Sequence, residues 1–305
     1  MDGNALLQFF QNNLTLIETI VPTVSATLFT SLFLRYNTRT TELEKLRAQK
    51  FDELSEELIK LGKMTHMEYF HWNRYFKIAK IADKHLKQNG LCNDDPTKYE
   101  FEWFIRFYEY AGKISNSDMQ QLWGKLLAGE LNKPGSVSYS LLHALYMMRK
   151  EEALTFANAC RFILNGYDGR PHLFLYLSSA PETYNARNLT TATLSNFQRL
   201  GLVVCDFHRE YVFQHKDRNA RFRGEVVRKS FRSGNNKITI SSTEKSNQVI
   251  KAGNVVLTPD GEMLYTILDD EFKRHSDSNL DFIVSMLERK GCLVQINDTY
   301  TTKFT

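Results

Sequence analysis

Asp260 and Glu271 are the residues whose types and spacing come nearest to a catalytic pattern. Pro259-Asp260 followed by Glu271-x-Lys273 imitates the P-D…(D/E)-x-K arrangement of metal-dependent nucleases, in which carboxylates hold Mg²⁺ and the lysine assists the nucleophile. In such a site the second carboxylate belongs on a strand beside the first. Here apolar residues repeat at helical spacing between the two, which places Glu271 nearly three turns from Asp260. A nuclease is therefore the weakest function that we consider.

A second acidic cluster alternates along the chain at Asp206, His208 and Glu210. On a strand these residues would share one face and could form a metal or acid–base site, although such clusters are more often a solvated strand edge. The four cysteines are widely spaced with no C-x-x-C pair, so a structural zinc site is not expected. No nucleotide-binding or nucleophile-elbow motif occurs. The sequence predicts no catalytic residue, no metal and no cofactor, and an enzyme is less expected than a binding protein.

Basic residues gather between His208 and Lys237. This stretch holds nine Lys or Arg against three acids, although the whole chain carries a net charge of only +4. Phe213, Phe222 and Phe231 are interleaved, so the stretch could bind a phosphate backbone and stack bases, or meet an anionic lipid or an acidic protein. A solvated hairpin whose arginines neutralise local acids is the plain alternative. The candidate binding residues are Arg209, Lys216, Arg218, Arg221, Arg223, Arg228, Lys229 and Arg232.

The N-terminal segment is almost free of charge. The stretch from Leu14 to Leu34 is long enough to cross a bilayer once, and Arg35 follows it as the positive-inside rule requires. Glu18 and Pro22 weaken insertion, so a helix buried in the core or in an oligomer interface is the main alternative. A third possibility is a segment that is hidden in the resting protein and docks on a membrane when it is released. The residues assigned to membrane or assembly are Leu14, Ile17, Ile20, Val24, Leu28, Phe29, Leu32 and Phe33.

The elements that must position these residues are mostly helical up to about residue 166. Apolar residues make up 42% of the 305 residues and charged residues 24%, which excludes wholesale disorder and a polytopic membrane protein. Helical periodicity predicts helices over about 38–62, 65–88, 99–113, 117–131 and 151–164.

The pattern changes beyond residue 166. HLFLYL at 172–177 and the alternating stretches 226–231 and 237–240 predict strands, while residues 189–200, 259–272 and 279–289 predict helices. We therefore expect a mainly α protein, with an N-terminal helical bundle followed by a smaller α+β module of winged-helix type. The expected parts are an apolar segment over 1–36, the bundle over 37–166 and the module over 167–305.

The block SNSDMQQLWGKLLAGELNKPGSVS at residues 115–138 resembles the hallmark of an uncharacterised bacterial domain family, written roughly S-x-x-x-M-Q-x-L-W-x-x-L-L-A-G-E…P-G-S-x-S. The resemblance extends over about residues 40–300. The block is also similar to a helix of the Abi-alpha abortive-infection proteins. These resemblances imply no enzymatic activity, a location in the bacterial cytoplasm or at the inner membrane, and a role in phage defence. The residues of the signature are Gln120, Leu122, Trp123, Leu126, Leu127, Gly129, Glu130, Pro134 and Gly135.

Physical chemistry favours a structural role for this block. Trp123 lies on the apolar stripe of its helix, and Ser117 with Gln120 has the spacing of a capping box. Glu130 is unfavourable near a helix C-terminus because of the macrodipole, so we expect it to have a basic partner or to cap the amides of another helix.

The leading hypothesis is a non-enzymatic interaction protein of a bacterial anti-phage defence system of the abortive-infection type. Its expected partners are copies of itself or another protein, and its N-terminal segment would act in assembly or on a membrane. The first alternative is a nucleic-acid-binding sensor that uses the basic hairpin. The second is the metal-dependent nuclease.

Overall fold

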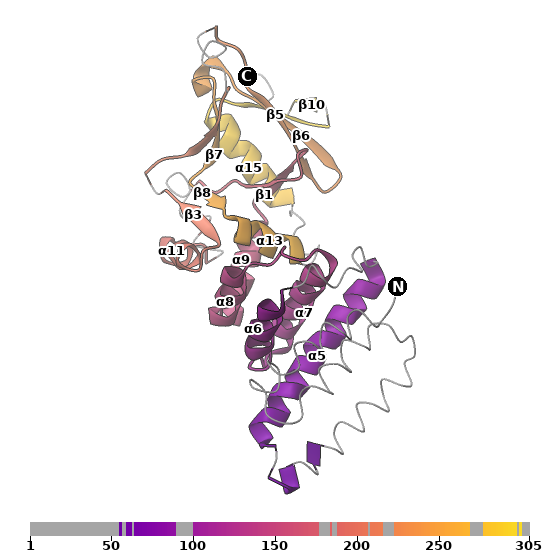
Figure 1. Ribbon diagram of the computed structural model, residues 1–305. Helices are drawn as coiled ribbons and strands as arrows, with labels where there is room; N and C mark the ends of the chain where they lie inside the picture. The colour runs from indigo at the N-terminus through magenta and orange to yellow at the C-terminus, as the bar shows by residue number, and fades with distance from the viewer. Residues whose placement is uncertain are drawn as a thin grey trace. The chain divides into compact units, whose positions relative to one another are not determined.

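A computed structural model gives the fold (Figure 1) and describes residues 55–56, 59–62, 64–89, 100–176, 184, 188–206, 208–215, 223–268, 277–297 and 299–300. The chain divides into two compact units between Val137 and Ser138. The predicted apolar segment over 1–36, and with it the membrane or assembly residues from Leu14 to Phe33, lies outside the described residues. No helix among the residues described is long and apolar enough to span a membrane.

The first unit contains three described helices of more than two turns: α5 (His66–Asn89), α6 (Phe101–Ala111) and α7 (Ser117–Asn132). Their core is aromatic, since the ring of Phe107 lies 5.2 Å from that of Trp103 and 5.3 Å from that of Trp123. α5 contacts α7 closely. A Cβ atom on Gly124 would lie 2.4 Å from Cγ2 of Ile81, so this crossing requires glycine.

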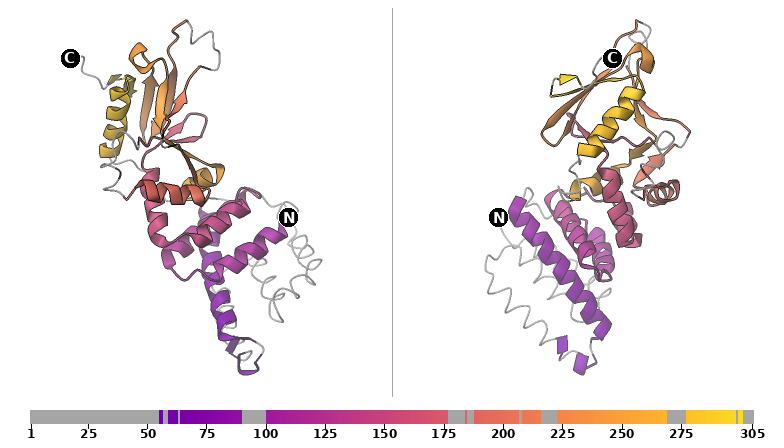
Figure 2. Two further views of the ribbon diagram at one scale, coloured as in Figure 1. Left: turned by 90° about the vertical axis from the view of Figure 1, so that its left-hand side faces the viewer. Right: turned by 180° about the vertical axis from the view of Figure 1, so that it is seen from behind.

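The second unit joins helices to three antiparallel sheets. Its helices are α8 (Tyr139–Met147), α9 (Lys150–Cys160), α11 (Thr191–Arg199), α13 (Pro259–Ile267) and α15 (Asp277–Arg289). The largest sheet has the order β10-β9-β6-β5-β1-β2, and α15 lies against its strands in the views of Figure 2. Its strands are β1 (Ile163–Gly166), β2 (Pro171–Leu173), β5 (Arg228–Ser233), β6 (Asn236–Ser241), β9 (Leu293–Ile296) and β10 (Thr299–Tyr300).

Two smaller sheets complete this unit. β3 (Val203–Cys205) pairs with β8 (Val255–Leu257), and β4 (Tyr211–Phe213) pairs with β7 (Ile250–Gly253). A 3-10 turn over Glu244–Ser246 links β6 to β7. β7 also approaches the chain after β2, because Gly253 forms a bridge with Leu175. A Cβ atom on Gly253 would lie 2.2 Å from the Leu175 carbonyl oxygen, which only glycine permits.

The prediction of a mainly α protein with a helical bundle and a smaller module is wrong, because the fold is mixed α/β. Helices α8 and α9 lie within residues 37–166, which were expected to form the bundle, but they belong to the unit that holds the sheets. The apolar stripe of a helix shows that the helix is covered but not whether a helix or a strand covers it. The predicted helix over 151–164 ends at Cys160, and Ile163 and Leu164 pair with β2 as part of β1.

The predicted capping box at the start of α7 is also wrong. The N-cap of α7 is Asn116, whose side-chain oxygen accepts the N–H groups of Asp118 and Met119, rather than Ser117. The Gln120 side chain donates to the Ile114 carbonyl oxygen at 2.8 Å, so it does not close the expected capping box. Thr258 caps α13, with Pro259 in the first turn as the sequence predicts.

Candidate functional site

The β5–β6 hairpin presents a polar face. Side chains alternate along a strand, so Arg228, Ser230 and Arg232 lie on one side of β5. The register places them opposite Ser241, Thr239 and Lys237 of β6, respectively. We call the face formed by these side chains the polar face: Arg228, Ser230, Arg232, Lys237, Thr239 and Ser241.

Hydrogen bonds fix the centre of the polar face while its cations reach solvent. The Ser230 and Thr239 hydroxyls lie 3.2 Å apart, and Arg228 Nε donates to Ser241 Oγ at 3.3 Å. Arg228 and Arg232 are exposed. In the part of the chain that the structure describes, no carboxylate lies within ion-pair distance of either guanidinium. These two guanidinium groups therefore carry positive charge that no acid among the described residues neutralises.

The opposite face of the same strands is buried and apolar. The Phe231 ring lies 5.5 Å from Phe174, 5.6 Å from His172 and 5.8 Å from Phe213. Burial lowers the pKa of His172. Lys229 belongs to this side, with its Nζ atom 5.9 Å from the centre of the Phe213 ring. Lys229 thus points away from the arginines with which the sequence groups it.

Tyr167 extends the polar face beyond β1. Arg232 pairs with Asn165 of β1, and its guanidinium carbon lies 4.5 Å from the centre of the Tyr167 ring. Tyr167 is not among the predicted site residues, because it lies far along the chain from the basic stretch. The only sequence signal was an aromatic residue in the glycine-flanked turn Gly166–Gly169.

The remaining predicted basic residues do not join the polar face in the described structure. Arg209 is exposed in the loop between β3 and β4. The Arg223 guanidinium forms an ion pair with Glu225 at 2.7 Å. At this one position the structure therefore agrees with the alternative in which arginines of a solvated hairpin neutralise local acids. Lys216, Arg218 and Arg221 lie outside the described residues.

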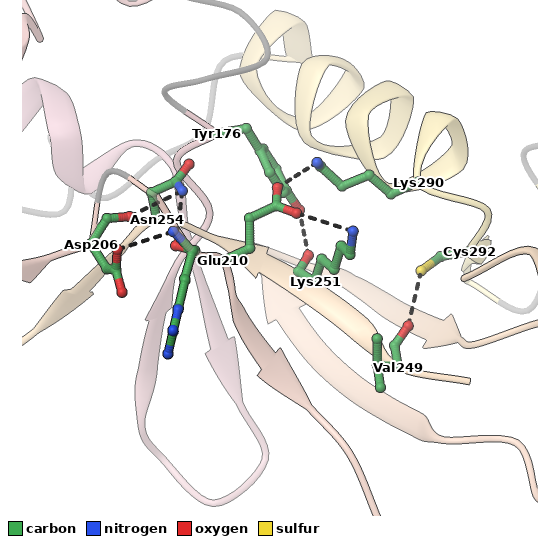
Figure 3. A network of polar contacts seen from close by, with 9 residues as sticks. Tyr176, Asp206, Glu210, Val249, Lys251, Asn254, Lys290 and Cys292 are labelled. Atoms are coloured by element: carbon green, nitrogen blue, oxygen red, sulfur yellow. Dashed lines mark hydrogen bonds and ion pairs between the residues drawn. The ribbon is translucent and has the colours of Figure 1, made fainter. Parts of the chain in front are cut away.

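The acidic cluster does not converge on one site (Figure 3). The Asp206 carboxylate accepts the backbone N–H groups of His208 and Arg209, each at 3.0 Å, and so shapes the loop. Glu210 turns elsewhere, because its carboxylate forms ion pairs with Lys290 and, at 3.4 Å, with Lys251. Among the described residues, no group of His, Cys, Asp and Glu could hold a metal ion.

Glu210 instead belongs to a polar network that joins α15, β7 and the β3–β4 loop. The Tyr176 hydroxyl donates to the Lys251 carbonyl oxygen at 2.9 Å, and Lys290 Nζ lies 5.1 Å from the centre of the Tyr176 ring. Asn254 Nδ2 donates to the Arg209 carbonyl oxygen at 2.9 Å. Burial raises the pKa of the nearby Cys292 thiol, which favours the unreactive protonated form. The network therefore holds these three elements together, and we call it the clamp.

Asp260, the first residue of the nuclease pattern, is held by hydroxyl groups. Its carboxylate accepts hydrogen bonds from Ser138 Oγ and Ser140 Oγ, both at 2.6 Å, and so connects α13 to the start of α8. Glu271 and Lys273 lie outside the described residues. The nuclease arrangement thus stays a prediction, while Asp260 has a structural role that explains its position.

The signature block is structural where it is described. Glu130 is buried, and its carboxylate accepts the backbone N–H groups of Gly135 at 2.6 Å and Val137 at 2.8 Å. The carboxylate therefore fixes the loop that follows its own helix. We had expected it to pair with a basic residue or to cap the amides of another helix. Trp103 Nε1 donates to the Val137 carbonyl oxygen at 2.8 Å, so both sides of this loop are held. The other buried members of the signature include Gln120, Trp123, Leu126 and Leu127.

Fold and site together define a mixed α/β protein in which one sheet presents a cationic, hydroxyl-bearing face. The chain belongs to the family described as "Protein of unknown function (DUF2806)", whose model matches residues 73–274. This confirms the predicted membership of an uncharacterised domain family. No curated protein and no solved structure matches the chain. The resemblance to abortive-infection proteins stays a prediction.

Proposed function

We propose that the protein binds nucleic acid through the polar face of the β5–β6 hairpin. The observation that carries this proposal is the pair Arg228 and Arg232, which are exposed on one side of one strand with no carboxylate in ion-pair distance among the described residues. A surface with uncompensated guanidinium groups attracts phosphates, and counterion release then stabilises the complex.

The layout of the polar face suits a phosphate backbone. Arg228 and Arg232 are four residues apart on a strand, which separates their Cα atoms by about 13 Å. The half-buried Ser230 lies between them, and hydroxyls are common donors to phosphate oxygens. Arg232 also lies directly opposite Lys237, so both strands place a basic residue at this end of the face.

The test is the salt dependence of binding. Fluorescence anisotropy with a labelled nucleic acid at about 50 to 200 mM salt should show affinity that falls steeply as salt rises. The variant Arg228→Gln/Arg232→Gln should bind more weakly at every salt concentration, with a log–log slope reduced by about 1.4 to 1.8 because two phosphate contacts are lost. The matched control Arg199→Gln/Arg289→Gln removes the same net charge from exposed positions on α11 and α15. Binding that is absent, insensitive to salt or equally weakened by the control would refute the proposal.

A role in anti-phage defence, assembly with copies of itself or a partner, and action on a membrane stay predictions from the sequence. The residues that would carry assembly or membrane contact, Leu14 to Phe33, lie outside the described part of the chain. Deletion of residues 1–34 should abolish a defence phenotype in cells, and full protection by the truncated protein would contradict that role.

A further inference from the structure

Tyr167 is an exposed aromatic residue at the edge of the polar face. It is 51% exposed although the Arg232 guanidinium lies 4.5 Å from the ring centre. A guanidinium at that distance interacts with one ring face through cation–π attraction.

The turn that carries Tyr167 is held in one conformation. Gly166 N donates to the Arg170 carbonyl oxygen at 2.8 Å, and the Asp168 carboxylate accepts the Arg170 N–H at 3.1 Å. Gly169 supplies the left-handed backbone that closes the turn, with φ of +80°. Because the backbone and the Arg232 contact already restrict the ring, little conformational entropy remains to be lost when a ligand covers it.

Tyr167 also lies next to the cations that the proposed function uses. Gly166, the last residue of β1, pairs with Phe231 of β5, and Tyr167 follows it as the first residue of the turn. The contact of its ring with the Arg232 guanidinium places Tyr167 beside the cations of the polar face. A phosphate backbone that crosses the polar face would thus bring its bases within reach of the ring.

We infer that the Tyr167–Arg232 pair is a stacking platform for an unpaired base, and hence that the ligand of the polar face is single-stranded nucleic acid. This inference rests on the proposed function. Every base has a flat π-face that can stack on tyrosine, whereas the bases of a duplex cover each other's faces. An exposed aromatic ring beside a track of cations is the arrangement by which sequence-tolerant single-strand binding works.

The test compares ligands that differ in their bases and variants that differ in their ring. Anisotropy is measured with single strands of about 16 nucleotides (oligo(dT) and oligo(U)), with an abasic strand of the same length, with a duplex and with poly-glutamate. Tyr167→Leu should weaken binding of oligo(dT) or oligo(U) about five-fold or more, while Tyr167→Phe should bind like the wild type. Binding of the abasic strand should not change with either variant, because it offers no base to stack. Matching unfolding curves establish that the variants are folded.

Three results separate this inference from the proposed function. If Tyr167→Leu binds oligo(dT) and oligo(U) like the wild type, or the duplex binds as tightly as the single strands, the stacking inference is overturned. Salt-dependent binding of the abasic strand and the duplex would then still support the polar face as a phosphate-binding surface. If no nucleic acid binds, or poly-glutamate binds equally well, both proposals are overturned.

Discussion

Replacement of Glu130 tests whether the signature block is structural. Glu130 is 2% exposed and accepts backbone N–H groups from Gly135 and Val137. Glu130→Ala leaves both donors without their acceptor. Gly135 is exposed, so water can replace the lost bond there, but Val137 is buried and its N–H stays unpaired. A lost hydrogen bond to a buried charged group costs about 1.5 to 3 kcal/mol. We expect the variant to lose about 2 to 3 kcal/mol, a large share of the stability of a typical domain.

The chain offers a selective probe for this measurement. Its three tryptophans, Trp72, Trp103 and Trp123, all belong to the first unit, and Trp103 contacts the loop that Glu130 holds. Urea unfolding followed by tryptophan fluorescence therefore reports on that unit. Glu109→Ala, an exposed glutamate on α6, is the matched control and should change the free energy of unfolding by less than about 0.5 kcal/mol. If Glu130→Ala costs no more than the control, the loop does not depend on the carboxylate and our reasoning is refuted.

The pH dependence of the same residue has a definite sign. Burial raises the pKa of Glu130 above 4.5, against the opposing effect of the amides of Gly135 and Val137. The folded protein then holds the proton on Glu130 more tightly than the unfolded chain does. The stabilisation that comes from this proton is complete below pH 4.5 and is lost as the pH rises through the pKa of Glu130 in the folded protein. The wild type should thus lose stability relative to Glu130→Gln as pH rises from about 4 to neutral. A difference that stays constant, or grows with pH, would contradict the raised pKa.

Two further substitutions test packing in the two units. Glu210→Gln leaves Lys290, whose side chain is 14% exposed, without its carboxylate, and should cost about 1 to 3 kcal/mol in urea unfolding followed by far-UV circular dichroism. Asp281→Asn, an exposed position on α15, is its control, and equal effects of the two would show that the clamp adds no stability. Gly124→Val would place a side chain against Ile81 and should cost about 1 to 3 kcal/mol by tryptophan fluorescence. Adding Ile81→Ala should restore part of that loss, and strictly additive losses would show that the two residues do not meet.

Sequence periodicity predicted those helices whose own residues determine where they begin and end. The helix expected over 65–88 is α5 at His66–Asn89, and the one expected over 117–131 is α7 at Ser117–Asn132. Both are long, and their apolar stripes persist over several turns, so the local signal is strong. The predicted end of the helix over 151–164 is wrong, because apolar residues such as Ile163 and Leu164 fit a buried strand as well as a helix. Both residues pair with β2, and although a strand is predicted at 172–177, the sequence does not show which segment pairs with it.

The candidate site was predicted only in part, for a similar reason. The basic stretch identified Arg228, Lys229 and Arg232 as one group, but strand alternation places Lys229 on the opposite face. The aromatic residue in the turn Gly166–Gly169 did not identify Tyr167 as part of the site, because its contact with Arg232 depends on the pairing of β1 with β5. Composition can therefore locate charge along the chain, whereas only the register shows which charges share a face.

The signature block at residues 115–138 and the face that we propose for binding contain different residues, although the family model spans both. Glu130 and Trp123 of the signature are buried in the first unit, where they hold a loop and fill a core. Buried groups of this kind specify a fold but cannot touch a macromolecular ligand. Arg228 and Arg232 reach solvent from the second unit and are not part of the signature. Loss of a signature residue should consequently remove nucleic-acid binding only through unfolding, whereas loss of the two arginines should remove it from a folded protein.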